Sequence, residues 1–393
     1  MKRRNFFKAT GLCTTSLLLP SFLKSLEWQS TLNLGKKRLI IVQLSGGNDG
    51  LNTIIPINNN LYQQLRPSIG IPKVDTLNID DSAAFNPSMI GMAKLLEKGW
   101  LSIINDVGYP NPDRSHFRSM DIWQTGSGSD QNWNTGWIGR LLDSYANQIH
   151  HNHTAIEVDQ QLSLVMKGLN KSGFAVKNPK KLNQLVQSIQ LKNYIFTGSV
   201  KELDFLYQTF AETQSTAGYV AEHSQKSKLN STYPNNEIGK NLKMIASLVL
   251  GGADTSIYYT STSGFDTHVR QLGQHGRLLG QLSDGLWALA QDLKQADELK
   301  NSVIMVFSEF GRRAKQNASG GTDHGTAGNV FIISDGLKKT GLYNPINNLT
   351  QLVNDDLVHQ VDFRSIYATL IDDLFQLPHA SILLNKFPKL RLF

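Results

Sequence analysis

Four polar segments of the sequence carry carboxylate and imidazole side chains beside apolar runs. The candidate metal ligands in these segments are Asp49, Asp266, His268, Glu309, Asp323 and His324. Such groups suit hard or borderline divalent ions, namely zinc, manganese, magnesium or calcium. Taken singly, Asp49 can stabilise a turn, His268 can begin a helix and Asp323 can cap one. Their joint placement after successive predicted strands favours a metal site.

A second group of reactive side chains is formed by Arg114, Ser115 and His116. It offers a hydroxyl beside an imidazole, with a guanidinium that can hold a tetrahedral oxyanion in a fork. We therefore predict catalytic or substrate-binding roles for these three residues. The alternative for Ser115 is an N-cap that starts the following helix. Asn48, Arg312 and Arg313 are further candidates for binding an oxyanion.

The elements that position these residues are predicted from apolar patterns. The run 38–44 is continuous rather than alternating, which is typical of a central parallel strand covered on both faces. The further expected strands are 100–107, 256–260, 302–307 and 329–334, and the expected helices are 86–98, 271–299 and 363–376. The order from 38–44 through a helix to 100–107 predicts a right-handed crossover and parallel pairing of those strands. Ligands collect at the carboxyl ends of such strands, where the polar segments fall.

These patterns predict an α/β fold with a mostly parallel central sheet flanked by helices. The stretch 165–250 is helical and polar, and we expect it to be an insertion on the sheet. The 393 residues, of which 40% are hydrophobic and 18% charged, provide ample material for a core. Disordered and fibrous classes are excluded.

The positive charge of the chain is concentrated at its start. Residues 1–26 hold five lysines and arginines and no acid, so they carry +5 and leave only +2 of the total +7 for the rest. A nucleic-acid partner is therefore not expected. The basic character of the chain largely describes this leader.

The leader has the features of a twin-arginine (Tat) export signal. Arg3 and Arg4 are followed by aromatic residues and Lys8, and then by an apolar run over 9–19. That run is much shorter than the roughly 20 residues that span a bilayer, so a stable transmembrane segment after cleavage is not expected. The alternative is an ordinary basic amphipathic N-terminus. Cys13, the only cysteine, lies here, so the mature chain would have no thiolate ligand.

With this interpretation, residues 1–26 are the signal peptide, 27–36 a linker and 37–393 a single domain. Export would place the protein in the periplasm or outside the cell, with the Tat translocon as its partner during transport. Because this route carries folded proteins, a cofactor can be inserted before export.

The motifs together resemble a known family. They are Leu44-Ser-Gly-Gly-Asn-Asp-Gly-Leu-Asn52, Arg114-Ser-His-Phe117, Gly136-Trp-Ile-Gly-Arg140, Gly264-Phe-Asp-Thr-His268, Ser308-Glu-Phe-Gly-Arg312, Gly321-Thr-Asp-His-Gly-Thr-Ala327 and Asp362-Phe-Arg364. With the leader, they are similar to the exported family called domain of unknown function 1501, of the alkaline phosphatase and sulfatase superfamily. The resemblance implies that Asp49, Asp266 and His324 stand at metal-ligand positions. Glu309 lies where an Asp-His pair ends a strand, and Ser115 falls in the segment that supplies the nucleophile.

The sequence departs from the superfamily pattern at three places. Arg270 stands where a histidine is expected after Asp266, and Phe310 stands where one is expected after Glu309. A single ion, or a site rebuilt with Asp323 and His268, is therefore easier to defend than two zinc ions. Proline occupies the reacting position of the segment matching the sulfatase motif, which speaks against formylglycine chemistry.

Two functions follow from this reading. The first is an exported, metal-dependent hydrolase or transferase of phosphate or related esters, acting on a small-molecule or glycan substrate. The second is a non-catalytic periplasmic binding or assembly protein that retains the fold with a degenerate metal site.

Overall fold

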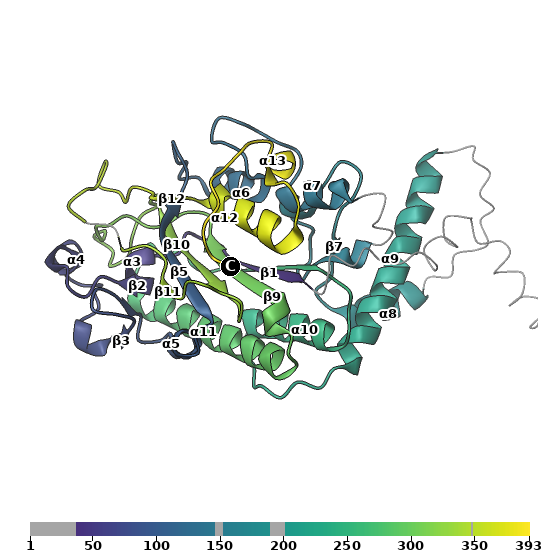
Figure 1. The fold of residues 1–393 in the computed structure, drawn as a ribbon, viewed down its shortest axis with the longest axis horizontal. Coiled ribbons are helices and arrows are strands. Elements are labelled where there is room, and N and C mark those ends of the chain that lie inside the picture. Colours follow the sequence, from purple (N-terminus) through teal and green to yellow (C-terminus); the bar gives the residue numbers. More distant parts are fainter. Residues whose placement is uncertain (1–36, 146–151, 189–200, 347–348) are drawn as a thin grey trace, which may run out of the picture.

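The computed structural model describes residues 37–145, 152–188, 201–346 and 349–393. The expected signal peptide and linker, 1–36, lie outside the described residues. The main sheet has the strand order β11-β5-β10-β9-β1-β8-β6-β7, and β12 pairs with β5 at one side (Figure 1). Its strands are β1 (Arg38–Leu44), β5 (Leu101–Gly108), β6 (Ala155–Glu157), β7 (Phe174–Ala175), β8 (Ile257–Thr262), β9 (Ser302–Ser308), β10 (Gly328–Ile333), β11 (Gly341–Leu342) and β12 (Val361–Asp362). A small second sheet has the order β2-β4-β3, with β2 (Ile54–Ile55), β3 (Leu77–Asn78) and β4 (Ala84–Phe85).

Strand β1 is the centre of the main sheet, as its continuous apolar sequence predicts. All seven of its residues are buried, and it pairs in parallel with β8 on one side and β9 on the other. Ile40 and Val42 enter one hydrophobic core, whereas Leu39 and Ile41 enter a second core on the opposite face. The mostly parallel α/β class is therefore confirmed.

Helices cover both faces of the sheet, as Figure 1 shows. One layer contains α5 (Ile90–Glu97), α10 (Glu237–Leu250) and α11 (Gln271–Gln295). The other contains α6 (His116–Thr125), α7 (Trp137–Ser144), α12 (Phe363–Thr369) and α13 (His379–Ile382), and a π-helical turn, Leu370–Leu374, continues α12. The shorter helices are α3 (Gly50–Thr53) and α4 (Asn60–Leu65), with 3₁₀ turns at Lys73–Asp75, Asn152–Thr154, Leu164–Met166 and Leu299–Asn301. Leucines spaced three or four residues apart along α11 face the sheet, which explains why this long helix forms.

The predicted pairing of the strands at 38–44 and 100–107 is wrong. Strands β9 and β10 lie between β1 and β5, and β10 runs antiparallel to both β9 and β5. The connection from β9 to β10 contains no helix, so the chain returns beside β9 in the opposite direction, as antiparallel pairing permits. The sheet is consequently mixed, although β5 keeps the direction of β1.

This topology brings five segment ends to one edge of the sheet. Leu44 lies in register with Thr262 of β8 and with Ser308 of β9, so these three strands end level. The antiparallel β10 begins at the same edge, where Gly328 pairs with Val107 near the end of β5. The loops after β1, β5, β8 and β9 and the loop before β10 therefore meet.

The stretch 165–250 contains α8 (Pro179–Ser188), α9 (Lys201–Lys226) and α10. Figure 1 shows α8 and α9 at one end of the molecule, whereas α10 packs against α11 under the sheet. Within the described ranges, no helix is long and apolar enough to cross a membrane.

Candidate metal centre

Three side chains from three different loops converge at the shared edge of the sheet. His116 is the first residue of α6, Asp266 follows β8, and His324 precedes β10. One nitrogen or oxygen of each lies within 4.8 Å of the corresponding atoms of the other two. Asp266 Oδ1 is 3.2 Å from His324 Nε2, and Asp266 Oδ2 is 3.6 Å from His116 Nε2. His116 and His324 are partly buried and Asp266 is exposed, so the group is open to a ligand.

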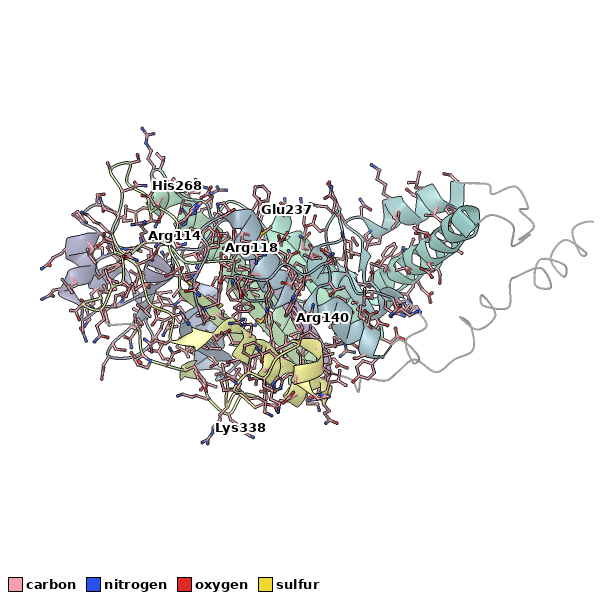
Figure 2. The ribbon with its side chains drawn as sticks, turned by 90° about the horizontal axis from the view of Figure 1, so that it is seen from above. Arg114, Arg118, Arg140, Glu237, His268 and Lys338 are labelled. Carbon is pink, nitrogen blue, oxygen red and sulfur yellow. The ribbon has the colours of Figure 1, made fainter. Side chains whose placement is uncertain are left out.

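His268 joins this group from the loop that carries Asp266. Its Nε2 lies 3.0 Å from Asp266 Oδ1 and 3.0 Å from His324 Nε2. Figure 2 shows His268 close to Arg114 at the end of the molecule away from α8 and α9. We call His116, Asp266, His268 and His324 the histidine cluster.

Each histidine of the cluster is held at its Nδ1 by an acceptor. His116 Nδ1 is 2.9 Å from Glu309 Oε1, and His268 Nδ1 is 3.2 Å from Asp323 Oδ1. His324 Nδ1 is 2.8 Å from the carbonyl oxygen of Arg114. Because a carbonyl and an ionised carboxylate only accept, Nδ1 carries the proton in each neutral ring, and each Nε2 presents a lone pair. This arrangement is typical of histidines that bind a metal.

The inner nitrogens of the cluster fit a cation. His116 Nε2 is buried and has no hydrogen-bond partner among the described residues. His268 and His324 turn their Nε2 atoms toward each other, although two lone pairs at that separation repel. His268 Nε2 also lies 3.3 Å from Arg312 Nη1. An ion bound between the rings and Asp266 would satisfy the nitrogens that lack a donor.

Asp266 is the anionic member of the cluster. Partial burial acts to raise its pKa, but hydrogen bonding and charge from Arg312, with a contribution from His324, lower the pKa of Asp266 to about 2. Arg312 Nη2 lies 2.6 Å from Asp266 Oδ1. The carboxylate is therefore ionised at neutral pH and available as an oxygen ligand.

Arg312 was expected to bind an oxyanion, but its guanidinium is bonded to groups inside the protein. Its guanidinium is fully buried and donates to the carbonyl oxygens of Gly46, Gly47 and Thr322 as well as to Asp266. With its donors committed inside the protein, Arg312 ties the turn after β1 to the loop after β8. We assign it to positioning Asp266.

The structure places Asp49 and Asn48 apart from the histidine cluster. Asp49 forms a fully buried ion pair with Arg66 at 2.6 Å and caps α3 by accepting from the backbone of Leu51. Burial acts to raise its pKa, but Arg66 outweighs that effect and the pKa of Asp49 is lowered. Asn48 is buried and bonded to Thr53 and His275. We therefore leave the expected metal ligand Asp49 and the expected oxyanion ligand Asn48 out of the proposed site.

Glu309 and Asp323, which were expected to be metal ligands, bond to histidines of the cluster instead. Glu309 is buried, and its Oε1 also accepts the backbone N–H of Gly46 at 2.8 Å. Asp323 accepts from Asn317 at 3.1 Å in addition to contacting His268. Both carboxylates orient histidines of the cluster, and neither belongs to the group whose atoms converge.

The three remaining predicted residues surround the cluster. Ser115 is exposed at the start of α6, and its side chain makes no capping hydrogen bond. Arg114 pairs with Asp356 at 2.7 Å, and its carbonyl holds His324. Arg313 is partly buried, and its guanidinium has no hydrogen bond or ion pair within the described part of the chain. Its charge acts on Asp323 and Asp356, and Arg313 remains a candidate oxyanion ligand.

Sequence reasoning missed several supporting residues. His116 was expected to act in catalysis, yet it lies among the metal-binding candidates. Arg66, Gln271 and His275 hold Asp49 or Asn48 in place, with Gln271 Nε2 donating to Asp49 Oδ2. Gln271 and His275 lie one turn apart on α11, a spacing that signals a shared helix face. Arg66 lies in a polar stretch with no distinguishing pattern.

The fold and the cluster define an α/β protein with a group of histidines and a carboxylate at the carboxyl edge of its sheet. The chain belongs to the family described as protein of unknown function (DUF1501), whose match spans residues 102–376. The membership expected from the sequence motifs is confirmed. No curated protein matches the sequence.

Several solved structures are similar to this chain in fold, at low sequence identity. One is the C-terminal periplasmic domain of EcEptC from Escherichia coli in complex with zinc, at 9% identity, covering 79% of this chain and 78% of that one, with a TM-score of 0.38. A second is the lipoteichoic acid synthase LtaP from Listeria monocytogenes, at 11% identity, 91% and 80% coverage and a TM-score of 0.40. A third is the sulfatase PsFucS1 from Pseudoalteromonas sp., at 14% identity, 94% and 76% coverage and a TM-score of 0.39. These likenesses supply no site residue, so the chemistry must be argued from the cluster itself.

Proposed function

We propose that the protein is an exported, metal-dependent hydrolase or transferase of phosphate esters or related oxyanion esters. The observation that carries the proposal is the convergence of His116, Asp266 and His324, with His268 beside them, each ring held at Nδ1 by a fixed acceptor. The ligand set is rich in imidazole, which suits zinc better than manganese, magnesium or calcium. We propose one ion.

The chemistry of such a site is ester activation. A divalent ion held by the cluster supplies Lewis acidity toward the ester oxygens and lowers the pKa of a nearby hydroxyl or water. Asp266 and the three histidines hold the ion, while Glu309 and Asp323 fix two of the rings. We propose that Arg313 neutralises the oxygens of the oxyanion.

Ser115 is the proposed nucleophile. Its exposed side chain stands between Arg114, whose carbonyl holds His324, and His116, a member of the cluster. In the substitution, the serine hydroxyl loses its proton to solvent and its oxygen bonds to phosphorus, while the bond from phosphorus to the leaving oxygen breaks and that oxygen takes up a proton. Water or an acceptor alcohol then loses a proton and bonds to phosphorus, the bond from phosphorus to the serine oxygen breaks, and the serine oxygen is protonated again. Direct attack by water is the alternative and would leave a Ser115→Ala variant active.

The cellular setting belongs to the same proposal. We propose that the twin-arginine leader directs the chain through the Tat translocon to the periplasm or the cell exterior. The substrate there would be a small molecule or a glycan that bears a phosphoester. The +2 charge beyond the leader gives no reason to expect a nucleic-acid partner.

One observation favours the non-catalytic alternative. Phe310 stands where a further metal histidine is expected, and its ring centroid lies 4.9 Å from those of both His116 and His324. This apolar ring fills space beside the cluster. The centre then either works with a single ion or serves binding alone.

The test is turnover of 4-nitrophenyl phosphate and 4-nitrophenyl sulfate by protein loaded with zinc or manganese. We expect metal-dependent release of nitrophenol, and a loss in Asp266→Asn greater than the about 10–100-fold typical of changes outside the ligand shell. Asp284→Asn, an exposed carboxylate on α11, is the matched control and should remain active. If the protein binds metal but hydrolyses neither ester, the enzyme proposal is contradicted and the non-catalytic binding protein is favoured.

A further inference from the structure

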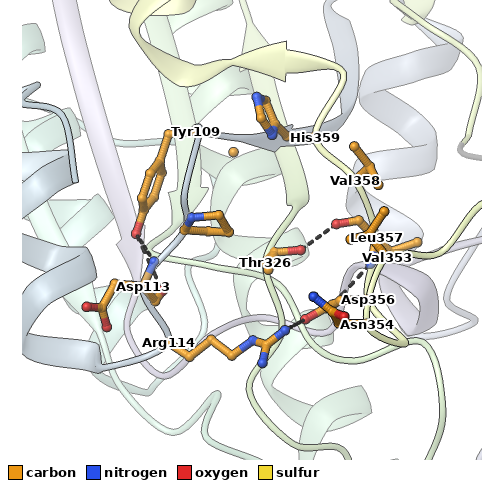
Figure 3. Close-up of a pocket in the computed structure, with 12 residues that line it drawn as sticks. Tyr109, Asp113, Arg114, Thr326, Val353, Asn354, Asp356, Leu357, Val358 and His359 are labelled. Atoms are coloured by element: carbon orange, nitrogen blue, oxygen red, sulfur yellow. Dashed lines mark hydrogen bonds and ion pairs between the residues drawn. The ribbon is translucent and has the colours of Figure 1, made fainter. Parts of the chain in front are cut away.

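A cavity of about 590 Å³ lies beside the segment that carries the histidine cluster (Figure 3). Tyr109 and Pro112 line one side, and Val353, Val358 and His359 line the other, with Thr326 between them. The volume is within the range of sites that hold small organic molecules, about 300–1,000 Å³. No predicted role of the cluster uses this space.

Two chain segments connect the cavity to the cluster. Arg114 lines the cavity and precedes His116 by two residues, and Thr326 lines it and follows His324 by two. The hydrogen bond from His324 Nδ1 to the Arg114 carbonyl fastens these segments together at 2.8 Å. The cavity and the cluster are therefore built on the same two chain segments.

The polar groups around the cavity are neutralised or already bonded. Arg114 pairs with Asp356, and Thr326 donates to the carbonyl of Leu357. Burial lowers the pKa of His359, so this ring is neutral at pH 7. Asp113 accepts the backbone N–H of Ser115, and Figure 3 shows its carboxylate turned away from the space. The cavity thus has no uncompensated positive charge to hold a phosphate or a sulfate.

Its walls favour an uncharged ring. Pro112 presents an exposed apolar face, whereas Tyr109 is only 2% exposed and contributes little surface. Two valines at the opposite rim are exposed, Val353 by 59% and Val358 by 38%. Such surfaces gain free energy from covering an aromatic or sugar ring, while the paired Arg114 and Asp356 can receive hydroxyl groups at one end.

We propose that this cavity binds the uncharged, ring-sized organic part of the ester whose oxyanion is held at the histidine cluster. The assignment rests on the proposed ester chemistry and narrows the substrate class to esters of aryl or sugar alcohols. Esters of small alcohols such as methanol would leave the cavity empty.

The test uses an uncharged probe that does not require the metal. Binding of 4-nitrophenyl β-D-glucoside to the full chain, stripped of metal with a chelator, is measured by calorimetry for the wild type, Val353→Trp and Val358→Trp. We expect both tryptophans to fill the cavity and to weaken binding by about tenfold or more, a change of about 1.4 kcal/mol. Val74→Trp is the matched control, since Val74 is 88% exposed in the turn Lys73–Asp75 and should bind as the wild type does.

The outcomes separate this proposal from the proposed function. The proposal is supported if the wild type and Val74→Trp bind the glucoside and both cavity variants do not. This conclusion does not depend on whether the protein hydrolyses an ester. Absence of binding to the wild type, or equal binding in all four proteins, overturns it even where metal-dependent ester hydrolysis is found. Glucoside binding without metal-dependent hydrolysis would instead refute the enzyme and retain the cavity.

Discussion

The three histidines of the cluster owe their orientation to the atoms bonded at their outer nitrogens. Two of these partners, Glu309 and Asp323, are carboxylates, and the third is a backbone carbonyl. The hydrogen bond that His116 donates to Glu309 is the leading cause that raises the pKa of His116. A histidine that is made more basic also binds a metal more strongly, provided that its Nε2 is unprotonated.

We predict that Glu309→Gln weakens metal binding by about 10–100-fold. Glutamine retains an oxygen that can accept from His116 and from Gly46, but it removes the charge. The measurement is competition for zinc against a chromophoric chelator at pH 7.5. Glu298→Gln is the matched control because Glu298 pairs with Arg38 at the opposite end of β1 and β9. Equal zinc affinity in wild type and Glu309→Gln would contradict the role given to this carboxylate.

A second residue, His275, should make the free energy of unfolding depend on pH. His275 is fully buried on α11 and bonded to Asn48, and burial lowers its pKa from 6.5 to about 4. Between these two values the unfolded chain takes up a proton that the folded protein does not, so His275 makes stability fall as the pH drops through this window. The size of the effect is about 3 kcal/mol.

We therefore predict that His275→Gln flattens the pH dependence of the free energy of unfolding. Glutamine can still donate to Asn48, but it cannot be protonated in the unfolded state. Urea unfolding of both proteins at several pH values between 4 and 7 gives the comparison, and the slope is diagnostic because the substitution can shift overall stability. An unchanged slope would show that His275 does not titrate in this way.

At the scale of elements, the turn after β1 determines where the loop after β8 lies. Gly46 has φ +121°, and a Cβ at this position would meet the backbone nitrogen of Asp266 at 2.3 Å. Arg312 bonds to the carbonyls of the same turn and to Asp266. The close approach and the buried guanidinium together fix the carboxylate of the cluster.

Gly46→Ala should therefore displace Asp266 as well as destabilise the fold. Gly99→Ala is the matched control, because Gly99 also has positive φ, +69°, but has no atom within 4 Å of an added Cβ. The control should lose about 1–2 kcal/mol from backbone strain alone. We expect Gly46→Ala to lose more in chemical unfolding and to bind zinc more weakly, whereas the control should keep zinc affinity. Equal effects of the two alanines would contradict the coupling.

The sequence predicted the strands more accurately than it predicted their pairing. The runs at 38–44 and 302–307 became β1 and β9 because a strand buried on both faces requires a continuous apolar run. The position of β10 between β9 and β5 depends on contacts between residues far apart in the chain, which a local pattern does not contain. Helix ends were also displaced, as at α5, which begins at Ile90 rather than at residue 86.

The sequence predicted where in the fold the candidate site lies, but not which residues form it. Segments after strands could be assigned to one edge from topology alone, and these supplied Asp266, His268 and His324. Local sequence did not show that Asp49 has a buried partner, because Arg66 lies seventeen residues away and reaches it only through the fold. It also did not show that His116 points toward the loops after β8 and before β10.

At the scale of the whole molecule, the cluster joins loops from three places along the chain, so metal binding and folding should be linked. An ion that binds only the folded protein adds about 2.7 kcal/mol of stability at a free concentration of one hundred times its dissociation constant. We predict that zinc raises the midpoint of thermal unfolding of the wild type and leaves that of Asp266→Asn unchanged. A similar rise in both proteins would show that zinc stabilises the fold at another place.

The most direct test of the metal centre is the metal content of the purified protein. Elemental mass spectrometry would compare wild type, Asp266→Asn and Asp284→Asn after removal of loosely bound ions. The histidine cluster predicts about one tightly held divalent ion per chain in the wild type and in Asp284→Asn, and none in Asp266→Asn. The absence of a stoichiometric ion from the wild type, or an equal amount in Asp266→Asn, would contradict the assignment of the cluster as a metal centre.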